Sequence, residues 1–208
     1  MSERLSPAVF IDRDGTLMED CVYCSDPKKV KIFKGVSEAL RRLKSTGFKL
    51  IIITNQSGIG RGLITLEQYR AVAAELLRQL GDGLIEATYF CPHVPGQYSS
   101  HRKPAPGMVV DAAREQRVDL SRSFLIGDSE IDVECAHNAG VRAIRVRTGL
   151  QRDTTASMAD WRVDDLPAAA EIILSTNRDM TLPAEFDAAT DQLQTARLGF
   201  QSGGESKD

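Results

Sequence analysis

The chain lacks several features that would place it outside ordinary soluble proteins. No apolar run in its 208 residues is long enough to cross a bilayer, and its first residues, MSERLSPA, lack the apolar segment of a secretory signal. Basic charge is not in excess, because 26 Lys and Arg stand against 29 Asp and Glu. The resulting net charge of −3 argues against a general nucleic-acid binder. We therefore expect a cytoplasmic protein with no membrane or nucleic-acid partner.

Cysteine is also scarce, with four residues at positions 21, 24, 91 and 135. In a chain of this length they do not resemble a disulfide framework. Cys21 and Cys24 form a Cys-x-x-Cys pattern, but no thioredoxin-like sequence follows it, so we expect no redox function. The composition, 42% hydrophobic and 26% charged, is that of a soluble domain with an ample core. We expect this domain to act as a monomer.

Short apolar runs alternate with helical patterns along the chain. Strands are predicted over 8–12, 48–54, 84–91, 123–127, 141–146 and 161–163, and helices over 36–46, 65–80, 106–117, 129–139 and 167–174. Thr65 and Gln68 predict a capping box at the start of the second helix. This alternation predicts an α/β fold with a central parallel sheet that helices cover on both faces.

The predicted domain spans residues 1–175. Residues 176–208 turn polar and end in GGESKD, which predicts a tail that is partly disordered or helical. A helix over 181–199 is one possibility for that tail.

The stretch VFIDRDGTL, from Val9 to Leu17, predicts a buried strand that ends in Asp12 and Asp14. In open α/β sheets, ligands bind at the carboxyl ends of the strands. One carboxylate there can attack or bind metal while the other transfers protons. A surface turn and a calcium loop are the alternatives, but a calcium loop needs Glu at the position of Tyr23.

Three further predicted strands are followed by polar groups suited to phosphate or metal. Thr54–Ser57 offers a hydroxyl and backbone N–H groups for phosphate oxygens, although an ordinary turn has the same residues. Asp128, with Asp132 four residues beyond, is placed for a hard cation or as a helix N-cap. Lys103 offers a compact charge for a phosphoryl oxygen or a carboxylate, whereas most single lysines are solvated.

Together these stretches resemble the haloacid dehalogenase superfamily of phosphatases. Its four signatures appear in order as DRDGT at 12–16, TN at 54–55, Lys103, and GDSEID at 127–132. The segments FIDRDGTL, TNQSGIGRG, YFCPH, RKPAPGM, IGD and VRTG narrow the likeness to the subgroup of heptose bisphosphate phosphatases and histidinol-phosphatase domains. The resemblance implies a three-layer Rossmann-like fold with a central parallel sheet and a minimal cap.

The same resemblance implies a Mg²⁺-dependent phosphatase that acts on a small phosphorylated sugar. Asp12 would be the nucleophile that forms an aspartyl-phosphate, and Asp14 the general acid and base. The carboxylates of Asp12 and Asp128 and the backbone carbonyl of Asp14 would hold Mg²⁺. Thr54 and Lys103 would stabilise the transferring phosphoryl group.

Substrate contacts implied by the resemblance lie in the loops around these residues. They are Arg13, Asp20, Tyr23, Asn55, Gln56, Arg61 and Arg102. Arg61 and Arg102 are the best candidates for a second phosphate, because guanidinium groups bind phosphate bidentately.

Alternative functions stay open at this point. A histidinol-phosphatase or another sugar or nucleotide phosphatase would carry the same signatures. A non-catalytic binding protein with this fold would be expected to have lost Asp12 or its partners. The glycine run Gly58–Gly62 suggests a dinucleotide loop, but its third glycine comes one position early and Thr54–Ser57 separates it from the strand.

One loop departs from the family pattern. The family's zinc loop reads Cys-x-His and then Cys-x-Cys before Arg-Lys, whereas here Cys91 and His93 remain and Cys-x-Cys is absent. His101 is a candidate third ligand, with Cys21 or Cys24 as a fourth. Structural zinc needs four nitrogen or sulfur ligands, so we expect an ordered loop without zinc.

Overall fold

The structure, a computed structural model, describes residues 5–150 and 156–181 of the chain. Its contacts divide the chain into two units, Met1–Leu174 and Ser175–Asp208, and the first contains all the strands described below. The predicted tail beyond residue 181 lies outside the described residues. In the ranges that are described, no helix has both the length and the apolar content needed to cross a membrane.

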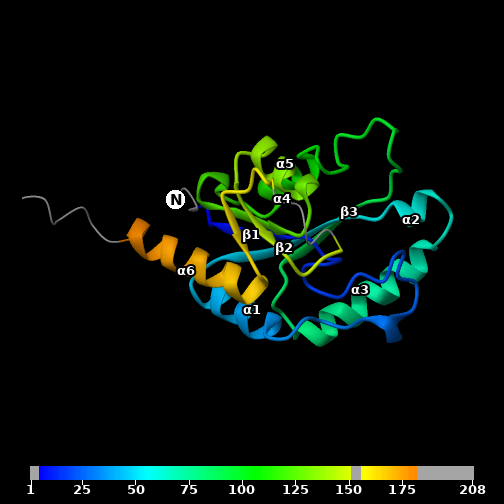
Figure 1. The fold of residues 1–208 in the computed structure, drawn as a ribbon, viewed down its shortest axis with the longest axis horizontal. Coiled ribbons are helices and arrows are strands. Elements are labelled where there is room, and N and C mark those ends of the chain that lie inside the picture. The colour runs from blue at the N-terminus through cyan, green and yellow to red at the C-terminus, as the bar shows by residue number, and fades with distance from the viewer. Residues whose placement is uncertain (1–4, 151–155, 182–208) are drawn as a thin grey trace, which may run out of the picture. The chain divides into compact units, whose positions relative to one another are not determined.

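Six strands form one parallel sheet in the order β3-β2-β1-β4-β5-β6 (Figure 1). Their bounds are Ala8–Ile11 for β1, Lys49–Asn55 for β2, Ala87–Cys91 for β3, Phe124–Gly127 for β4, Arg142–Val146 for β5 and Trp161–Val163 for β6. In the register, Phe10 of β1 lies between Ile51 of β2 and Leu125 of β4. The chain order switches direction between β1 and β4, so the crevice for a ligand opens where these two strands end.

Helices cover both faces of the sheet (Figure 1). One face carries α1 (Val36–Ser45), α3 (Leu66–Leu80) and the part of α6 (Leu166–Thr181) before Ser175; the other carries α4 (Gly107–Glu115) and α5 (Glu130–Asn138). Successive residues of β1 alternate between the two cores, because side chains of a strand point to opposite faces. Val9 and Ile11 pack with α1 and α3, while Ala8 and Phe10 pack with α4 and α5. This double burial explains the unbroken apolar run of β1.

The predicted α/β fold and its central parallel sheet are confirmed, with small shifts at the ends of elements. The capping box is present, since the Gln68 backbone N–H donates to Thr65 Oγ1 at 3.1 Å and the Thr65 N–H donates to Gln68 Oε1 at 2.8 Å. Strand β3 begins at Ala87 rather than Leu84, because the Leu84 N–H donates to the Gly81 carbonyl in a turn.

Three short helices were not predicted. They are η1 (Pro27–Lys29), α2 (Ser57–Gly60) and η2 (Leu120–Arg122). The helix α2 includes two of the three glycines in the run after β2, which had indicated a loop. The last helix, α6, reaches Thr181 rather than Leu174.

Candidate active site

The carboxyl ends of β1 and β4 bring three acids and one lysine together. Asp12 follows β1, Asp128 follows β4, and Asp132 lies in the first turn of α5. One oxygen from each of the three carboxylates lies within 4.8 Å of the others. Lys103, from the loop before α4, places its Nζ 2.6 Å from Asp12 Oδ1 and 2.6 Å from Asp132 Oδ1. Three residues that the sequence assigned to chemistry, Asp12, Lys103 and Asp128, therefore meet at the predicted edge of the sheet.

Lys103 is held in this position from several directions. Lys103 is only 3% exposed, and its Nζ also donates to the Ile53 carbonyl at 3.2 Å. The Asn55 side chain makes two hydrogen bonds to the Lys103 backbone. Asn55 Oδ1 accepts from the Lys103 N–H, and Asn55 Nδ2 donates to the Lys103 carbonyl, each at 3.0 Å. The alternative of a solvated surface lysine is therefore wrong for Lys103.

Burial and like charge shift the pKa values of these groups. Burial raises the pKa of Asp12 well above its usual range; Lys103 opposes this rise, and the nearby acids add to it. Burial also raises the pKa of Asp128 to about 7, with the charge of Asp132 as the next cause. Burial alone would lower the pKa of Lys103, but Asp12 and Asp132 outweigh it and raise that pKa. The lysine therefore stays charged inside a cluster with an excess of carboxylates.

This cluster has the donor set of a magnesium site. With all groups ionised, the three carboxylates and one ammonium would carry a net charge of −2, which a divalent cation would balance. Mg²⁺ prefers carboxylate oxygens and usually takes only one or two from the protein, with water or substrate completing its shell. The residues present therefore fit Mg²⁺; Asp12 and Asp128 would be its ligands, while Asp132 pairs with Lys103.

Asp14 faces a second set of partners. Arg13 donates to it through Nε and Nη2, both at 3.0 Å, and Gln56 Nε2 donates to Asp14 Oδ2 at 2.9 Å. Gln56 Nε2 also donates to Thr54 Oγ1 at 2.9 Å, and Gln56 Oε1 accepts from Arg13 Nη2 at 3.0 Å. A connected hydrogen-bond network therefore orients Asp14 and Thr54, the predicted proton donor and phosphoryl ligand.

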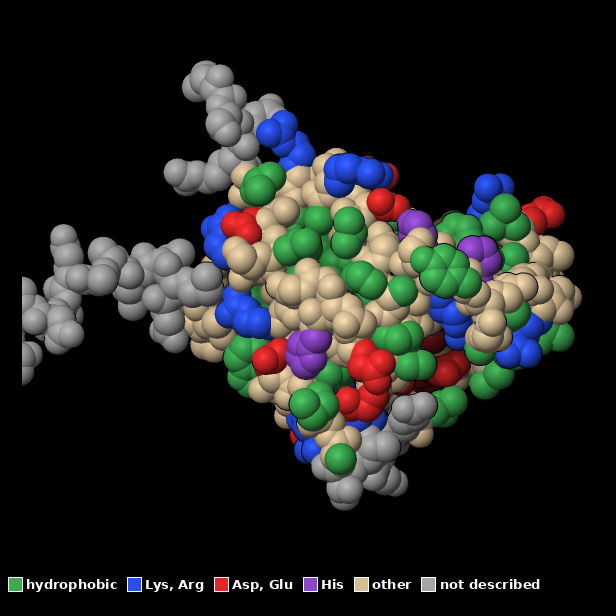
Figure 2. Space-filling model, turned by 90° about the horizontal axis from the view of Figure 1, so that it is seen from above, with side chains coloured by type: hydrophobic (Ala, Val, Ile, Leu, Met, Phe, Trp, Pro, Cys, Tyr) green, Lys and Arg blue, Asp and Glu red, His purple; other side chains and the backbone are tan. Residues whose placement is uncertain are grey.

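Two cavities meet at Asp14 and Asn55. The acidic cavity, about 240 Å³, is lined by Asp12, Asp14, Thr54, Asn55, Arg102, Lys103, Asp128, Ser129, Ile131 and Asp132. The loop cavity, about 260 Å³, is lined by Arg13, Asp14, Asp20, Val22, Tyr23, Asn55, Gln56, Ser57 and Gly58. Acidic side chains gather in a hollow of the surface in Figure 2. All the predicted substrate contacts line one of these cavities except Arg61, which is exposed at the end of α2.

Comparison with known proteins identifies relatives of this chain. A family model described as HAD-hydrolase-like matches residues 100–169. A D-glycero-beta-D-manno-heptose-1,7-bisphosphate 7-phosphatase of Yersinia pestis is 38% identical over 179 residues, which cover 78% of this chain and 94% of that protein. An enzyme of the same name from Helicobacter pylori strain J99 is 41% identical over 139 residues, 65% of this chain and 79% of the relative.

The chain belongs to the heptose bisphosphate phosphatase family of haloacid dehalogenase-like hydrolases. A solved structure supports the same assignment. The D,D-heptose 1,7-bisphosphate phosphatase from B. bronchiseptica, complexed with magnesium and phosphate, superimposes with a TM-score of 0.75 at 32% identity. The match covers 82% of this chain and 99% of that one.

The loop between β3 and α4 is held by contacts among its own polar side chains and with α4. Ser99 Oγ lies 2.8 Å from His93 Nδ1 and 3.6 Å from Cys91 Sγ. The His101 ring instead contacts Asp111 at 2.7 Å and Ser100 at 3.0 Å. Of the described residues, the cluster with metal-ligand geometry is the acidic one, and Cys91, His93 and His101 do not form another.

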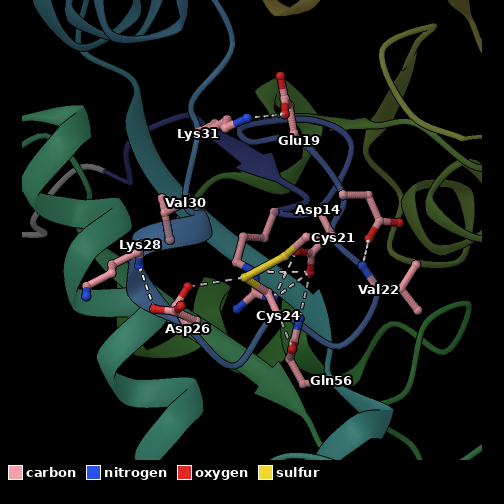
Figure 3. Close-up of a disulfide and its surroundings, with 12 residues drawn as sticks. Asp14, Glu19, Cys21, Val22, Cys24, Asp26, Lys28, Val30, Lys31 and Gln56 are labelled. Atoms are coloured by element: carbon pink, nitrogen blue, oxygen red, sulfur yellow. Dashed lines mark hydrogen bonds and ion pairs between the residues drawn. A yellow bond between two sulfur atoms is a disulfide. The ribbon is translucent and has the colours of Figure 1, made fainter.

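A difference from expectation concerns Cys21 and Cys24. They form a disulfide in the loop between β1 and α1, with Cα atoms 5.3 Å apart (Figure 3). Cys91 and Cys135 are free and buried. Reading the four cysteines as unlike a disulfide framework was therefore wrong for this pair. Counting cysteines detects bridges between distant segments, whereas a Cys-x-x-Cys bridge depends on the local path of the backbone.

Asp132 was noted in the sequence but was not assigned to the site. In this family member, its Oδ1 contacts Lys103 at 2.6 Å and its Oδ2 accepts from Ser129 Oγ at 2.6 Å. The only sequence signal for a role of Asp132 was its spacing from Asp128. That signal was ambiguous, because an acid at this position of a helix is also an ordinary cap. The pairing of Arg13 with Asp14 had no signal in the sequence.

Proposed function

We propose that this protein is a Mg²⁺-dependent phosphatase that removes the 7-phosphate of D-glycero-D-manno-heptose 1,7-bisphosphate through an aspartyl-phosphate on Asp12. The observation that carries the proposal is the buried pairing of Asp12 with Lys103, at 2.6 Å, where β1 ends beside β4. The names of the relatives support the choice of substrate.

Each group in the acidic cavity has a role that suits its contacts. The Asp12 carboxylate attacks phosphorus and breaks the bond to the sugar oxygen, while Lys103 and Thr54 neutralise charge on the phosphoryl oxygens. Bound Mg²⁺ would supply further positive charge there and hold a phosphoryl oxygen in place. The main task of the protein in phosphoryl transfer is positioning and charge neutralisation, and the buried lysine provides both.

Asp14 lies where a proton is needed. It lines both cavities, so a phosphoryl group in the acidic cavity and a sugar in the loop cavity would place the leaving oxygen near it. Asp14 gives a proton to that oxygen and later takes one from the water that hydrolyses the aspartyl-phosphate. Arg13 and Gln56 hold its carboxylate in one orientation throughout.

Two arginines suit a substrate with a second anionic group. Arg13 lines the loop cavity and is 2% exposed, and its buried Nη1 has no hydrogen-bond partner among the described residues. Arg102 lines the acidic cavity and donates through Nη1 to the His93 carbonyl at 2.9 Å. A substrate oxygen that pairs with one of these guanidinium groups would form a charged hydrogen bond, which is stronger than a neutral one.

A substrate comparison tests the proposed function. Purified protein with Mg²⁺ is assayed on both anomers of the heptose 1,7-bisphosphate, on histidinol phosphate and on p-nitrophenyl phosphate. We expect one heptose bisphosphate anomer to give the highest kcat/KM. A higher kcat/KM for histidinol phosphate would show that the protein is a histidinol-phosphatase instead.

Arg102→Ala tests the second anionic contact. Charged hydrogen bonds contribute about 1.5–3 kcal/mol, so kcat/KM for the sugar bisphosphate should fall on the order of tenfold or more. The loss on p-nitrophenyl phosphate should be much smaller, because that compound has no second phosphate. Arg70→Ala, at an exposed position of α3, is the matched control. Equal losses on both substrates would mean that Arg102 serves the common chemistry or the fold.

A further inference from the structure

The Cys21–Cys24 disulfide lies in the segment that forms one wall of the loop cavity. Asp20, Val22 and Tyr23 line that cavity, and the last two are the residues enclosed by the bridge. The bridge thus fixes the ends of a short turn whose middle faces the proposed sugar site.

The backbone of this turn needs such a constraint. Val22 has φ 39° and Tyr23 has φ 56°, both in the left-handed region, and neither is a glycine. Residues with a Cβ rarely adopt this region, and a β-branched valine least of all. One hydrogen bond supports the turn from its own loop, since the Val22 N–H donates to Asp20 Oδ1 at 2.9 Å. We therefore expect the turn to relax toward a more extended path when the covalent bond is broken.

The two cysteines differ in how they are anchored. Cys24 is 3% exposed and belongs to the hydrophobic core, and Cys21 packs against that core while partly buried. The turn also touches α2, because a Cβ added to Gly58 would lie 2.6 Å from the Tyr23 ring. The disulfide therefore connects an exposed cavity wall to the core through Cys24.

We propose that the Cys21–Cys24 disulfide is a positioning element that fixes Val22 and Tyr23 as the wall of the loop cavity and so sets the affinity for the part of the substrate beyond the scissile phosphate. The assignment of that cavity to substrate rests on the proposed function. The acidic cavity contains none of residues 20–24, so we expect the phosphoryl chemistry itself to depend little on the bridge.

Reduction of the bridge is a balanced two-electron exchange. A small dithiol such as dithiothreitol gives two electrons and two protons, so that Cys21 and Cys24 become thiols while the sulfurs of the reagent join in a ring. The same loss of constraint follows from Cys21→Ser, which leaves the buried Cys24 in place and spares the core.

Kinetics on two substrates test the proposal. We expect dithiothreitol to raise KM for the sugar bisphosphate about tenfold, with kcat/KM on p-nitrophenyl phosphate unchanged, and Cys21→Ser to reproduce this without reductant. Dithiothreitol should have no further effect on Cys21→Ser, which controls for other actions of the reagent. Unchanged KM values, or equal losses on both substrates, would overturn the proposal.

A second measurement needs no phosphatase activity. Hydrogen–deuterium exchange of a peptide that spans residues 20–26 should be faster in the reduced protein and in Cys21→Ser than in the oxidised protein. Mass spectrometry after alkylation without reductant should find Cys21 and Cys24 unlabelled. Unchanged exchange, or labelled cysteines in protein purified without reductant, would overturn the proposal. If the protein hydrolyses no phosphate ester, the proposed function is wrong. Hydrogen–deuterium exchange would still show whether the disulfide orders Val22 and Tyr23.

Discussion

At the scale of single residues, the acidic cluster shows what the sequence could and could not predict. Asp12 and Lys103 are 91 positions apart, yet their places after predicted strands indicated that they would meet. The double contact of Asp132 and the pairing of Arg13 with Asp14 could not be predicted, because they depend on side-chain directions. Those directions follow from packing around the site, which a linear pattern does not contain.

Asp128 makes the stability of the metal-free protein depend on pH. Its pKa of about 7 in the folded protein lies above the ordinary value of about 3.9, so the folded state binds more protons than the unfolded state between these values. Ionisation of Asp128 therefore destabilises the folded protein progressively as pH rises from about 4 to 7. Asp128→Asn removes this penalty and should raise the Tm of metal-free protein by several degrees at pH 8 and by less at pH 5.

Thermal unfolding in a chelating buffer, at several values of pH, checks this prediction. Mg²⁺ should raise the Tm of the natural protein and leave that of Asp128→Asn almost unchanged, because the variant lacks a metal ligand. Asp82→Asn, in an exposed turn, is the control and should follow the natural protein. If the Tm difference between Asp128→Asn and the natural protein were the same at every pH, ionisation of a buried Asp128 would not be its cause.

At the scale of elements, the strands and long helices were predictable and the loops were not. The apolar run of β2 and the capping box of α3 are strong local signals, and both elements form where they were predicted. The helix α2 was missed because glycines favour loops on average, and tertiary contacts decide such cases. The turn at Val22 was missed for the opposite reason, since neither enclosed residue favours a left-handed backbone.

The loop between β3 and α4 leads to a prediction about metal content. Ser99 occupies the space between Cys91 and His93, His101 contacts Asp111, and the disulfide engages Cys21 and Cys24. Too few ligands remain for a four-coordinate zinc, so purified protein should hold well under one zinc per chain by elemental analysis. One zinc per chain that survives dialysis against a chelator would contradict this prediction.

At the scale of the whole molecule, the order of strands explains why the site forms where it does. Strands β2, β1 and β4 are neighbours, so Thr54, Asp12 and Asp128 all emerge at one edge although they come from distant parts of the chain. Helices on both faces bury this sheet, and that burial is also the first cause of the raised pKa values of Asp12 and Asp128. The architecture therefore supplies both the position and the electrostatics of the proposed chemistry.

The central claim is that Asp12 is the nucleophile of a Mg²⁺-dependent phosphatase, and the most direct test is kcat of Asp12→Asn on the preferred sugar phosphate. Removal of a nucleophile should lower kcat by several orders of magnitude, on the order of 10³-fold or more, while the thermal unfolding transition remains cooperative. Asp82→Asn, measured beside it, should keep the natural kcat. An Asp12→Asn protein that turns over at a rate near that of the natural protein would contradict the mechanism.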